Sequence, residues 1–457
     1  MKIIRTKAQA ITYLEQYIPK DREFKFPGEL GLERTTYLLK LLGEPQNKIK
    51  VIHIAGTSGK GSTSYLVSVI LRSLGFKVGL CVSPILLDTR ERFQIDNKLI
   101  TEIELYAGLN KIVTAVAKVS KTKYGAPTYY EILVALTYYI FAKKQVDYAV
   151  IETGLGGLLD GTNVVTREDK MAVITQIGHD HIGILGKTLD KIAFQKAGII
   201  HKHNLVVALK QHPKVLRVIR ERVQQQKAKL HLVGKENIQN VSLLPMPKFN
   251  FHYLGIDIIG IELQMMGSFQ VQNCSLALAT ISLLSQRDMF ELDTRKIRLA
   301  IKRSIFLGRM QQMNINNQKV VIDGAHNPQK MHMLAKNLVT YFPQQKFNFM
   351  VSLRRGKNYK EILRQIIPLA NRIIVTPFED QTKAQGFSAL AEDAKTIARI
   401  FQSLNFKKYT LYENSNEALE DLLKNSDSIG VITGSLYLVS EIYPVLLKKQ
   451  TNSFVVS

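Results

Sequence analysis

The stretch VIHIAGTSGKGS, residues Val51–Ser62, combines a β-branched run, a glycine-rich turn and the start of a helical pattern. Its glycines let the backbone approach a ligand closely, so that backbone N–H groups and the N-terminus of the following helix can face an anion. Lys60 adds a positive charge suited to the β- and γ-phosphates of a nucleotide. A standard phosphate loop has Ser or Thr directly after Gly-Lys, whereas here Gly61 follows and the hydroxyl comes at Ser62. Strand, turn, lysine and helix together still predict a phosphate-binding loop, and a turn that binds nothing is the weaker alternative.

Short β-branched runs alternate with longer helical patterns on both sides of this stretch. We expect strands over residues 50–55, 76–82, 146–152 and 171–176, and helices over residues 61–74, 101–120, 128–143 and 189–197. Such alternation predicts a parallel α/β sheet with helices on both faces. Residues 249–263 instead alternate around a central glycine, which predicts a strand pair, and helical patterns follow over residues 269–286 and 294–304.

The α/β alternation restarts after residue 305. Further strands are expected over residues 319–322, 347–351, 372–375, 408–411 and 430–433. We therefore predict a large N-terminal α/β domain over residues 1–305 and a smaller C-terminal α/β domain over residues 306–457. A ligand site is expected where two such domains meet.

Polar residues follow two of the predicted strands that accompany the phosphate loop. Glu152 ends one apolar run, and Asp180 and His181 come shortly after another. Ligands of such sheets bind at the carboxyl ends of the strands, and a carboxylate there is suited to Mg²⁺. On spacing alone, Glu152 has the alternative of being a solvated loop carboxylate.

The composition is that of a globular protein: 46% of the 457 residues are hydrophobic and 22% are charged. This excludes whole-chain disorder and fibrous structure. Two cysteines, Cys81 and Cys274, cannot form a disulfide framework, so a reducing compartment is expected. The start of the chain lacks the apolar core of a signal peptide, and the longest uncharged apolar run, residues 132–142, is shorter than the roughly 20 residues that span a bilayer. These features predict a cytoplasmic protein that does not bind membranes.

The chain is also strongly basic, because 62 Lys and Arg against 38 Asp and Glu give a net charge of +24. Such a charge favours nucleic acid, phosphates or polycarboxylates as partners. The alternative is a basic surface that is merely solvated, since the sequence has no Lys/Arg-rich tail. A nucleic-acid-stimulated NTPase would also need aromatic side chains interleaved with basic ones, and no such pattern stands out.

Six segments share their sequence and order with a known family. They are HIAGTSGKGS (53–62), ETGLGGLLDGTNVV (152–165), ITQIGHDHIGILGKTLDKIAFQKAGII (174–200), FLGRMQ (306–311), VIDGAHNP (321–328) and TGSLYLVSEI (433–442). The ordered set resembles folylpolyglutamate synthase/dihydrofolate synthase, of the Mur ligase superfamily. The resemblance implies the Mur ligase architecture. This consists of a phosphate-loop NTPase-like N-terminal domain with a parallel sheet and a smaller Rossmann-like α/β C-terminal domain.

The activity that the resemblance implies is ATP-dependent ligation of L-glutamate to a folate, to dihydropteroate, or to both. The γ-phosphoryl group of ATP moves to a substrate carboxylate, and the amine of L-glutamate attacks the acyl phosphate, releasing phosphate after ADP. Phosphoryl transfer of this kind needs a lysine, backbone donors and a divalent metal to neutralise developing charge. The implied partners are these small molecules, with no nucleic acid, and the protein is expected to be a monomer.

The resemblance also assigns roles to individual residues. It places the ATP phosphates at Gly56, Thr57, Ser58, Gly59, Lys60, Gly61 and Ser62. Nucleotide-binding positions further along the chain are Asn273, Arg309 and Asp323. Ligands of Mg²⁺, with two ions expected, are Ser83, Glu152 and His181. Catalytic residues are Lys60, His326 and Lys196, which is carbamylated in this family and so becomes an oxygen ligand suited to a hard metal. Substrate candidates are Tyr130 and Asp160.

Several of these residues also have plain structural interpretations. Lys196 can be a helix-end lysine that faces the C-terminal dipole, and Arg309 can be a surface arginine. Thr128 and Glu131, which flank Tyr130, form a capping-box pattern. A nucleotide-binding scaffold without catalysis is disfavoured because the catalytic and metal positions of the family are filled together.

Two further alternatives concern metal and substrate. His179 and His181 form an H-x-H pair that could suggest zinc, as do His201 and His203, but no cysteine lies near either pair. Ile85 and Leu158 stand where the family usually has His and Arg. These departures leave open which substrate is used and permit another Mur-type amide ligase.

Overall fold

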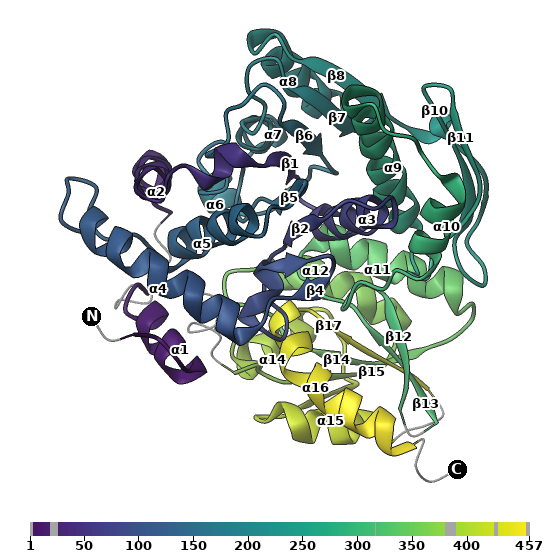
Figure 1. Ribbon diagram of the computed structural model, residues 1–457. Helices are drawn as coiled ribbons and strands as arrows, with labels where there is room; N and C mark the ends of the chain where they lie inside the picture. Colours follow the sequence, from purple (N-terminus) through teal and green to yellow (C-terminus); the bar gives the residue numbers. More distant parts are fainter. Residues whose placement is uncertain (1–2, 19–25, 316, 380–389, 425–427, 454–457) are drawn as a thin grey trace. The chain divides into compact units, whose positions relative to one another are not determined.

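The computed structural model describes residues 3–18, 26–315, 317–379, 390–424 and 428–453 (Figure 1). The chain forms two compact units. The first consists of Met1–Ser242, Lys248–Gln264 and Gln270–Ser304, and the second of Leu243–Pro247, Met265–Phe269 and Ile305–Ser457. The assignment of ATP binding to residues 1–305, and of a C-terminal Mur ligase domain to residues 306–457, stays a prediction.

An eight-stranded sheet forms the centre of the first unit, in the order β4-β3-β2-β5-β1-β6-β7-β8. Its strands are β1 (Lys50–Ala55), β2 (Val78–Cys81), β3 (Gln94–Ile95), β4 (Lys98–Leu99), β5 (Tyr148–Glu152), β6 (Met171–Ile174), β7 (Leu205–Leu209) and β8 (Lys229–Val233). From β2 to β8 neighbouring strands run parallel, while β3 and β4 pair antiparallel at one edge. The predicted parallel α/β sheet is confirmed, and β1 lies between β5 and β6.

Helices surround this sheet. They are α1 (Lys7–Glu15), α2 (Gly28–Leu41), α3 (Lys60–Ser73), α4 (Glu102–Val119), α5 (Tyr129–Lys143), α6 (Ile182–Leu185), α7 (Leu189–Ala197), α8 (Pro213–Gln225), α9 (Ser268–Asp288) and α10 (Thr294–Lys302), with 3-10 turns at Pro45–Lys48, Thr89–Arg92 and Lys235–Asn237. Val51 and Ala55 belong to clusters with α5 and α7, while Ile52 and Ile54, which point the other way along β1, are equally buried. Both faces of the sheet are therefore covered, as predicted.

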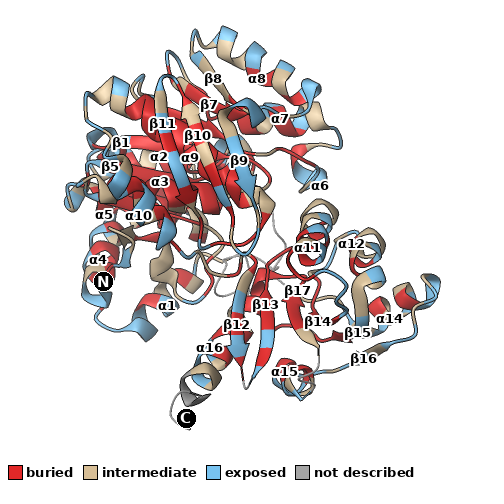
Figure 2. Ribbon diagram, turned by 90° about the vertical axis from the view of Figure 1, so that its right-hand side faces the viewer, coloured by how far each residue is buried: buried red, intermediate tan, exposed pale blue. Residues whose placement is uncertain are grey.

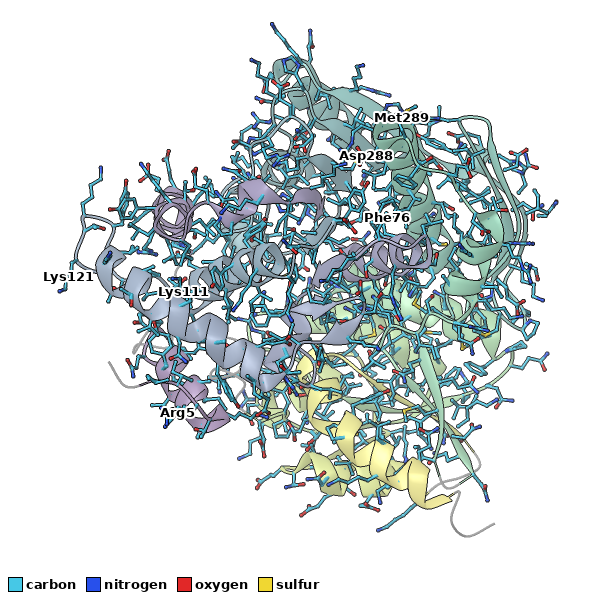
Figure 3. The ribbon with its side chains drawn as sticks, in the orientation of Figure 1. Arg5, Phe76, Lys111, Lys121, Asp288 and Met289 are labelled. Atoms are coloured by element: carbon cyan, nitrogen blue, oxygen red, sulfur yellow. The ribbon has the colours of Figure 1, made fainter. Side chains whose placement is uncertain are left out.

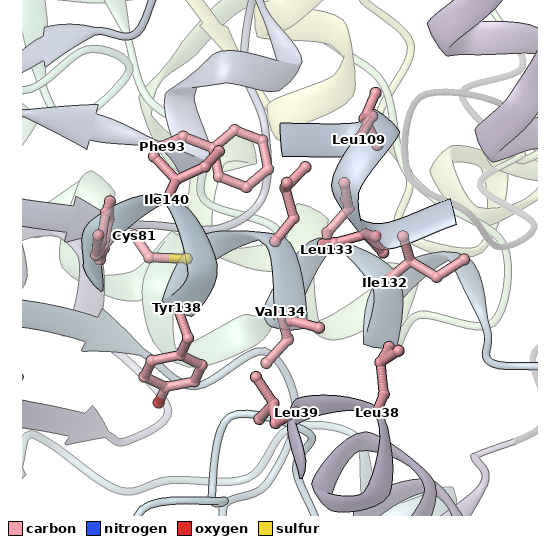
Figure 4. Close-up of a cluster of buried hydrophobic side chains, with 14 of the residues drawn as sticks. Leu38, Leu39, Cys81, Phe93, Leu109, Ile132, Leu133, Val134, Tyr138 and Ile140 are labelled. Atoms are coloured by element: carbon pink, nitrogen blue, oxygen red, sulfur yellow. The ribbon is translucent and has the colours of Figure 1, made fainter. Parts of the chain in front are cut away.

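A large cluster of apolar side chains in the first unit joins α2, α4 and α5 to the strands (Figure 4). Leu38 and Leu39 of α2 meet the buried side of α5, and Leu109 of α4 packs on the same helix. α5 begins with the predicted capping box, in which Thr128 accepts a hydrogen bond from the backbone of Glu131 and the Glu131 carboxylate accepts one from Thr128. This packing fixes the start of α5, where Tyr130 lies.

A smaller antiparallel sheet completes the first unit. It has the order β11-β10-β9, with β9 (Ile238–Ser242), β10 (Lys248–Tyr253) and β11 (Ile256–Glu262). β10 and β11 form the predicted strand pair and turn at Leu254 and Gly255. α10 packs against β11 and α3.

The second unit has a six-stranded sheet in the order β12-β13-β17-β14-β15-β16. Its strands are β12 (Gln311–Ile315), β13 (Gln318–Ile322), β14 (Phe347–Val351), β15 (Ala370–Val375), β16 (Tyr409–Leu411) and β17 (Ile429–Thr433), and its helices include α11 (Pro328–Tyr341), α12 (Tyr359–Ile366), α14 (Ala394–Ser403), α15 (Ser415–Leu423) and α16 (Leu436–Ser453), with a 3-10 turn at Ile367–Leu369. All strands pair in parallel except β12 with β13. In both units the buried residues follow the strands and the helix sides turned toward them (Figure 2).

Basic side chains are spread over the surface of the first unit. Arg5, Lys111 and Lys121 are exposed and point outward around α1 and α4 (Figure 3). Among the described residues, no helix combines the length and apolar character needed to cross a bilayer.

Candidate active site

The predicted phosphate loop leaves β1 and turns directly into α3. Gly59 caps α3 with a φ of 87°, in the left-handed region that favours glycine. A Cβ atom added to Gly59 would lie 2.2 Å from Asn273 Oδ1, and one added to Gly56 would lie 1.8 Å from Thr175 Oγ1. Both positions therefore require glycine, because Thr175 and Asn273 occupy the space that a side chain would fill.

Backbone hydrogen bonds attach this loop to the segment that follows β6. The N–H groups of Thr57 and Ser58 both donate to the carbonyl of Gln176, at 2.8 and 3.1 Å. The Thr57 hydroxyl lies 3.0 Å from the carbonyl of Gly178, and Thr175 Oγ1 donates to the carbonyl of Ser58 at 2.8 Å. The first N–H groups of α3 have no acceptor within their own helix, so they can face an anion.

The Ser58 hydroxyl is a further polar group of the phosphate loop. It is buried and has no hydrogen-bond partner within the described part of the chain. A buried hydroxyl without a partner costs free energy unless a ligand completes it. The loop thus offers backbone N–H donors, one side-chain donor and Lys60 to a phosphate group.

Glu152 and Ser83 lie beside Lys60. Lys60 Nζ is 3.7 Å from Glu152 Oε1, and the backbone N–H of Ser83 donates to Glu152 Oε2 at 2.9 Å. Only 4% of the Glu152 surface is exposed, so the alternative of a solvated loop carboxylate is wrong. The structure brings together these three predicted residues, a cation and a buried carboxylate among them, at the carboxyl end of the sheet.

Lys196 occupies the last turn of α7 but is not a surface residue. It is 4% exposed, and its Nζ donates to the carbonyl of Gly56 at 2.8 Å. The interpretation as a helix-end lysine is correct for its position in α7, but the side chain is buried and bonded to the phosphate loop. Its amino group lies at the phosphate loop.

His181 starts α6, after the segment that holds the loop. Its backbone has a φ of 48°, and its side chain is 38% exposed, with Nε2 4.0 Å from Asp180 Oδ1. Among the described residues no three His, Cys, Asp or Glu side chains gather in a metal cluster. A cation here would therefore also need oxygen ligands from phosphate and water, which is the usual situation of Mg²⁺. Glu152 and Ser83 offer carboxylate and hydroxyl oxygens, the kind of ligand that this ion prefers.

Tyr130 and Asp160, the substrate candidates, touch each other. The Tyr130 hydroxyl donates to Asp160 Oδ1 at 3.1 Å, and the same carboxylate accepts hydrogen bonds from Leu155 and Thr162. Burial, followed by the Asp160 charge, raises the pKa of Tyr130 well above its ordinary value. The Tyr130 ring also packs against the Arg92 guanidinium at 5.2 Å. Tyr130 therefore stays a neutral hydrogen-bond donor with a cation on its face.

Asn273 of α9 belongs to the surroundings of the loop as well. Its Oδ1 limits the space at Gly59, and its Nδ2 donates to Gln270 Oε1 at 2.9 Å. Asn273 is 5% exposed. Of the residues predicted to bind nucleotide beyond the loop, it is the one that the first unit contains.

The second unit contains Arg309, Asp323 and His326. Asp323 accepts hydrogen bonds from the backbone of Met310 at 2.9 Å and of Ala325 at 2.8 Å. Burial raises the pKa of Asp323, and the nearby Arg309 charge acts against that rise. His326 Nδ1 donates to the carbonyl of Gly324 at 2.8 Å, so that its Nε2 accepts from Lys330 Nζ at 3.0 Å. Asp323 and His326 lie in the turn that follows β13, and Arg309, which precedes β12, reaches Gly324 of that turn.

Some residues of this site were not singled out from the sequence. Gln176 acts through its backbone carbonyl, which no side-chain pattern reveals. Arg92 is buried, and its Nε has no partner among the described residues. A basic residue in the polar stretch LDTRERFQ gave no signal of burial.

The second H-x-H pair does not act as a unit. His201 Nε2 donates to Asn163 Oδ1 at 3.0 Å, whereas His203 is exposed and lies 3.3 Å from the carbonyl of Lys227. His201 and Arg222, which are half-buried, form a basic cluster with the buried His53 and Lys170. Burial, and then Lys170 and Arg222, lower the pKa of His201 to about 3.

This cluster predicts acid sensitivity. The unfolded chain binds a proton at His201 near pH 6.5 and the folded chain only near pH 3, so stability falls as the pH falls through that window. Between pH 7 and 4.5 we expect wild type to lose about 1–3 kcal/mol more unfolding free energy than His201→Gln, measured by urea unfolding. The exposed neighbour provides the control, because His203→Gln should lose as much as wild type. Equal losses in all three proteins would refute the assignment.

Two parts of the chain match known domain families. Residues 54–281 match the Mur ligase middle domain, and residues 307–445 match the dihydrofolate synthetase C-terminal domain. The chain is 30% identical over 423 residues to a dihydrofolate synthase/folylpolyglutamate synthase of Bacillus subtilis, covering 92% of this chain and 95% of that protein. It is 29% identical over 428 residues to a folylpolyglutamate synthase of Lacticaseibacillus casei, covering 91% and 94%.

Similar solved structures cover nearly the whole chain. The chain is similar to Mycobacterium tuberculosis folylpolyglutamate synthase complexed with ADP and AMPPCP, with a TM-score of 0.84, 27% identity, and coverage of 96% of this chain and 99% of that one. It is also similar to folylpolyglutamate synthase from Thermotoga maritima, with a TM-score of 0.81, 28% identity, and coverage of 97% and 98%.

Proposed function

Because the chain belongs to the folylpolyglutamate synthase/dihydrofolate synthase family of Mur ligases, we propose that it uses ATP to join L-glutamate to a folate, to dihydropteroate, or to both. It is an ATP-dependent carboxylate–amine ligase. The observation that carries the proposal is Lys60 beside the buried Glu152, at a glycine-rich loop that leads into the N-terminus of α3.

The phosphate loop binds and orients ATP in this proposal. Backbone N–H groups at the start of α3 and the Ser58 hydroxyl bind phosphate oxygens. The substrate carboxylate oxygen forms a bond to the γ-phosphorus while the bond to the ADP oxygen breaks, and Lys60 neutralises the charge that develops on the transferring group. The glutamate amine then attacks the acyl carbon, phosphate leaves, and the amine loses a proton.

We propose that Ser83, Glu152 and His181 hold Mg²⁺ near the phosphates, with two ions in total. Bound Mg²⁺ supplies positive charge that offsets the phosphates and the developing acyl phosphate. Lys196 is proposed to be carbamylated, because an ammonium at Gly56 would oppose a metal ion while a carbamate would bind it. From the second unit, Arg309 and Asp323 are proposed to bind nucleotide and His326 to act in catalysis.

Tyr130 and Asp160 are proposed to contact the substrate. Ile85 is 6% exposed, and Leu158 packs on α7, where its backbone N–H donates to Gln195 at 2.6 Å. Apolar side chains at these two positions remove polar contacts that His and Arg would offer. We therefore propose that the substrate preference of this chain differs from that of family members with His and Arg at these positions. A different Mur-type amide ligase is the second candidate function. We further propose a cytoplasmic monomer.

The test is ADP release with dihydropteroate and with tetrahydrofolate, each with and without L-glutamate. We expect release that requires both the pterin substrate and glutamate, and the pterin substrate that supports release identifies the activity. ADP release that responds to DNA or RNA instead would favour a nucleic-acid-stimulated NTPase. Release with an amino acid other than glutamate would favour another amide ligase.

A further inference from the structure

The side chain of Gln211, two residues beyond the end of β7, forms hydrogen bonds to the segment that follows β6. β1, β6 and β7 are neighbours in the sheet (Figure 1). Gln211 Oε1 accepts a hydrogen bond from the N–H of Ile177 at 2.7 Å. Its Nε2 donates to the carbonyls of Thr175 at 3.2 Å and Leu209 at 3.3 Å.

The residues that Gln211 binds lie on either side of Gln176. The Gln176 carbonyl is the acceptor for both Thr57 and Ser58 of the phosphate loop. A single amide side chain thus fixes the backbone before and after the peptide group that holds the loop. Hydrogen bonds to both neighbours of Gln176 restrict the direction in which its carbonyl can point.

Gln211 is half-buried beside a cavity. It lines a cavity of about 370 Å³ together with Lys210, Lys235 and Gln272. A shorter side chain would enlarge an existing space rather than open a hole in a close-packed core. Replacing Gln211 therefore removes hydrogen bonds and leaves the apolar core intact.

We propose that Gln211 is a positioning residue of the nucleotide site, which acts on ATP through Thr175, Ile177 and the Gln176 carbonyl. This inference rests on the proposed function, since it concerns how the same loop binds ATP. It assigns no contact between Gln211 and the nucleotide. Its expected signature is weaker binding of ATP and ADP with unchanged affinity for the pterin substrate.

Three substitutions distinguish the hydrogen bonds of Gln211 from the volume of its side chain. Gln211→Glu keeps the shape and the acceptor for Ile177, but turns an oxygen toward the Thr175 and Leu209 carbonyls. Gln211→Met keeps the volume and removes both kinds of hydrogen bond, and Gln211→Ala removes the side chain. For the Met and Ala variants we expect the dissociation constant of ADP to rise about tenfold, the effect of roughly one net hydrogen bond, and more for Glu.

Gln318 of β13 provides a matched control. It is buried, and its Nε2 also donates to two backbone carbonyls, those of Leu422 and Ser428, each at 3.1 Å. Gln318→Met should lower the thermal midpoint of the second unit and leave ADP binding unchanged. A general effect of losing a buried amide is thereby distinguished from an effect on the loop.

The experiment measures ADP binding by calorimetry, together with KM for ATP, KM for the pterin substrate and kcat. A rise in the ADP dissociation constant and in KM for ATP, with KM for the pterin substrate unchanged, supports the inference. If wild type binds ADP and turns over while all Gln211 variants bind ADP equally well, the inference is overturned and the proposed function stands. If wild type binds no ADP, the proposed function is wrong, and the inference that rests on it is wrong as well. Loss of the folded state in all three variants would also overturn the inference, because the role would then be structural.

Discussion

Replacing Lys60 by alanine is expected to lower kcat by about 10²–10⁴-fold, or a few kcal/mol of transition-state stabilisation, with the fold intact. Lys60 is the first residue of α3, at the end of the phosphate loop, and its side chain is 17% exposed. Its ammonium is the positive charge that the loop offers to a transferring phosphoryl group. Single-turnover ADP formation with saturating substrates measures the chemical step directly.

Lys50 is the matched control for this prediction. It lies at the opposite end of β1, where its Nζ is 3.3 Å from the Asp288 carboxylate. Lys50→Ala removes a lysine–carboxylate pair at the far end of the strand that leads to the phosphate loop, and it should leave the rate unchanged. Near-normal turnover in Lys60→Ala would contradict the phosphate-loop assignment. A loss of the same size in both variants would show that the effect comes from folding.

Strands and helices with strong local patterns were predictable from the sequence. The bounds of β1 and α7 agree with the expected residues, and the capping box at Thr128 sets the start of α5. β7, α8 and β8 were not predicted, because LVVAL is a short apolar run that periodicity alone does not assign to a strand. β12 was missed as well. Its sequence QQMNI is largely polar, and pairing with β13 rather than propensity makes it a strand.

Some residues of the candidate site were also predictable from the sequence, and others were not. Lys60 and Glu152 were predictable because each follows a strand of a parallel sheet, and the carboxyl ends of such strands share one edge. The parts played by Gln176 and Gln211 were not, since they act on the backbone of distant residues. Lys196 shows the limit most clearly. Its place in the last turn of α7 is equally compatible with solvent, and only tertiary packing puts its amino group on the Gly56 carbonyl.

Lys196→Ala is expected to lower ligase activity by at least about 10²-fold. The amino group is buried at the loop, and as an ammonium it would repel the metal ion that Glu152 and Ser83 are proposed to hold. Reaction of the neutral amine with CO₂ forms an N–C bond and releases a proton, which leaves a carbamate with two oxygens. Such a group supplies oxygen ligands suited to a hard metal ion.

The carbamate predicts chemical rescue, which an ordinary lysine does not. Short carboxylates such as formate or acetate should enter the space left by Lys196→Ala and restore part of the activity, while chloride should not. Lys191→Ala, at an exposed position of α7, is the control and should keep full activity without added carboxylate. Crystallographic density for the wild type with ATP and Mg²⁺ decides the chemistry, since the carbamate adds three atoms beyond Nζ. Clear density for a plain ammonium in an active complex would refute the carbamate. The burial of Nζ against Gly56 would then mark Lys196 as a loop-positioning residue, which no added carboxylate could replace.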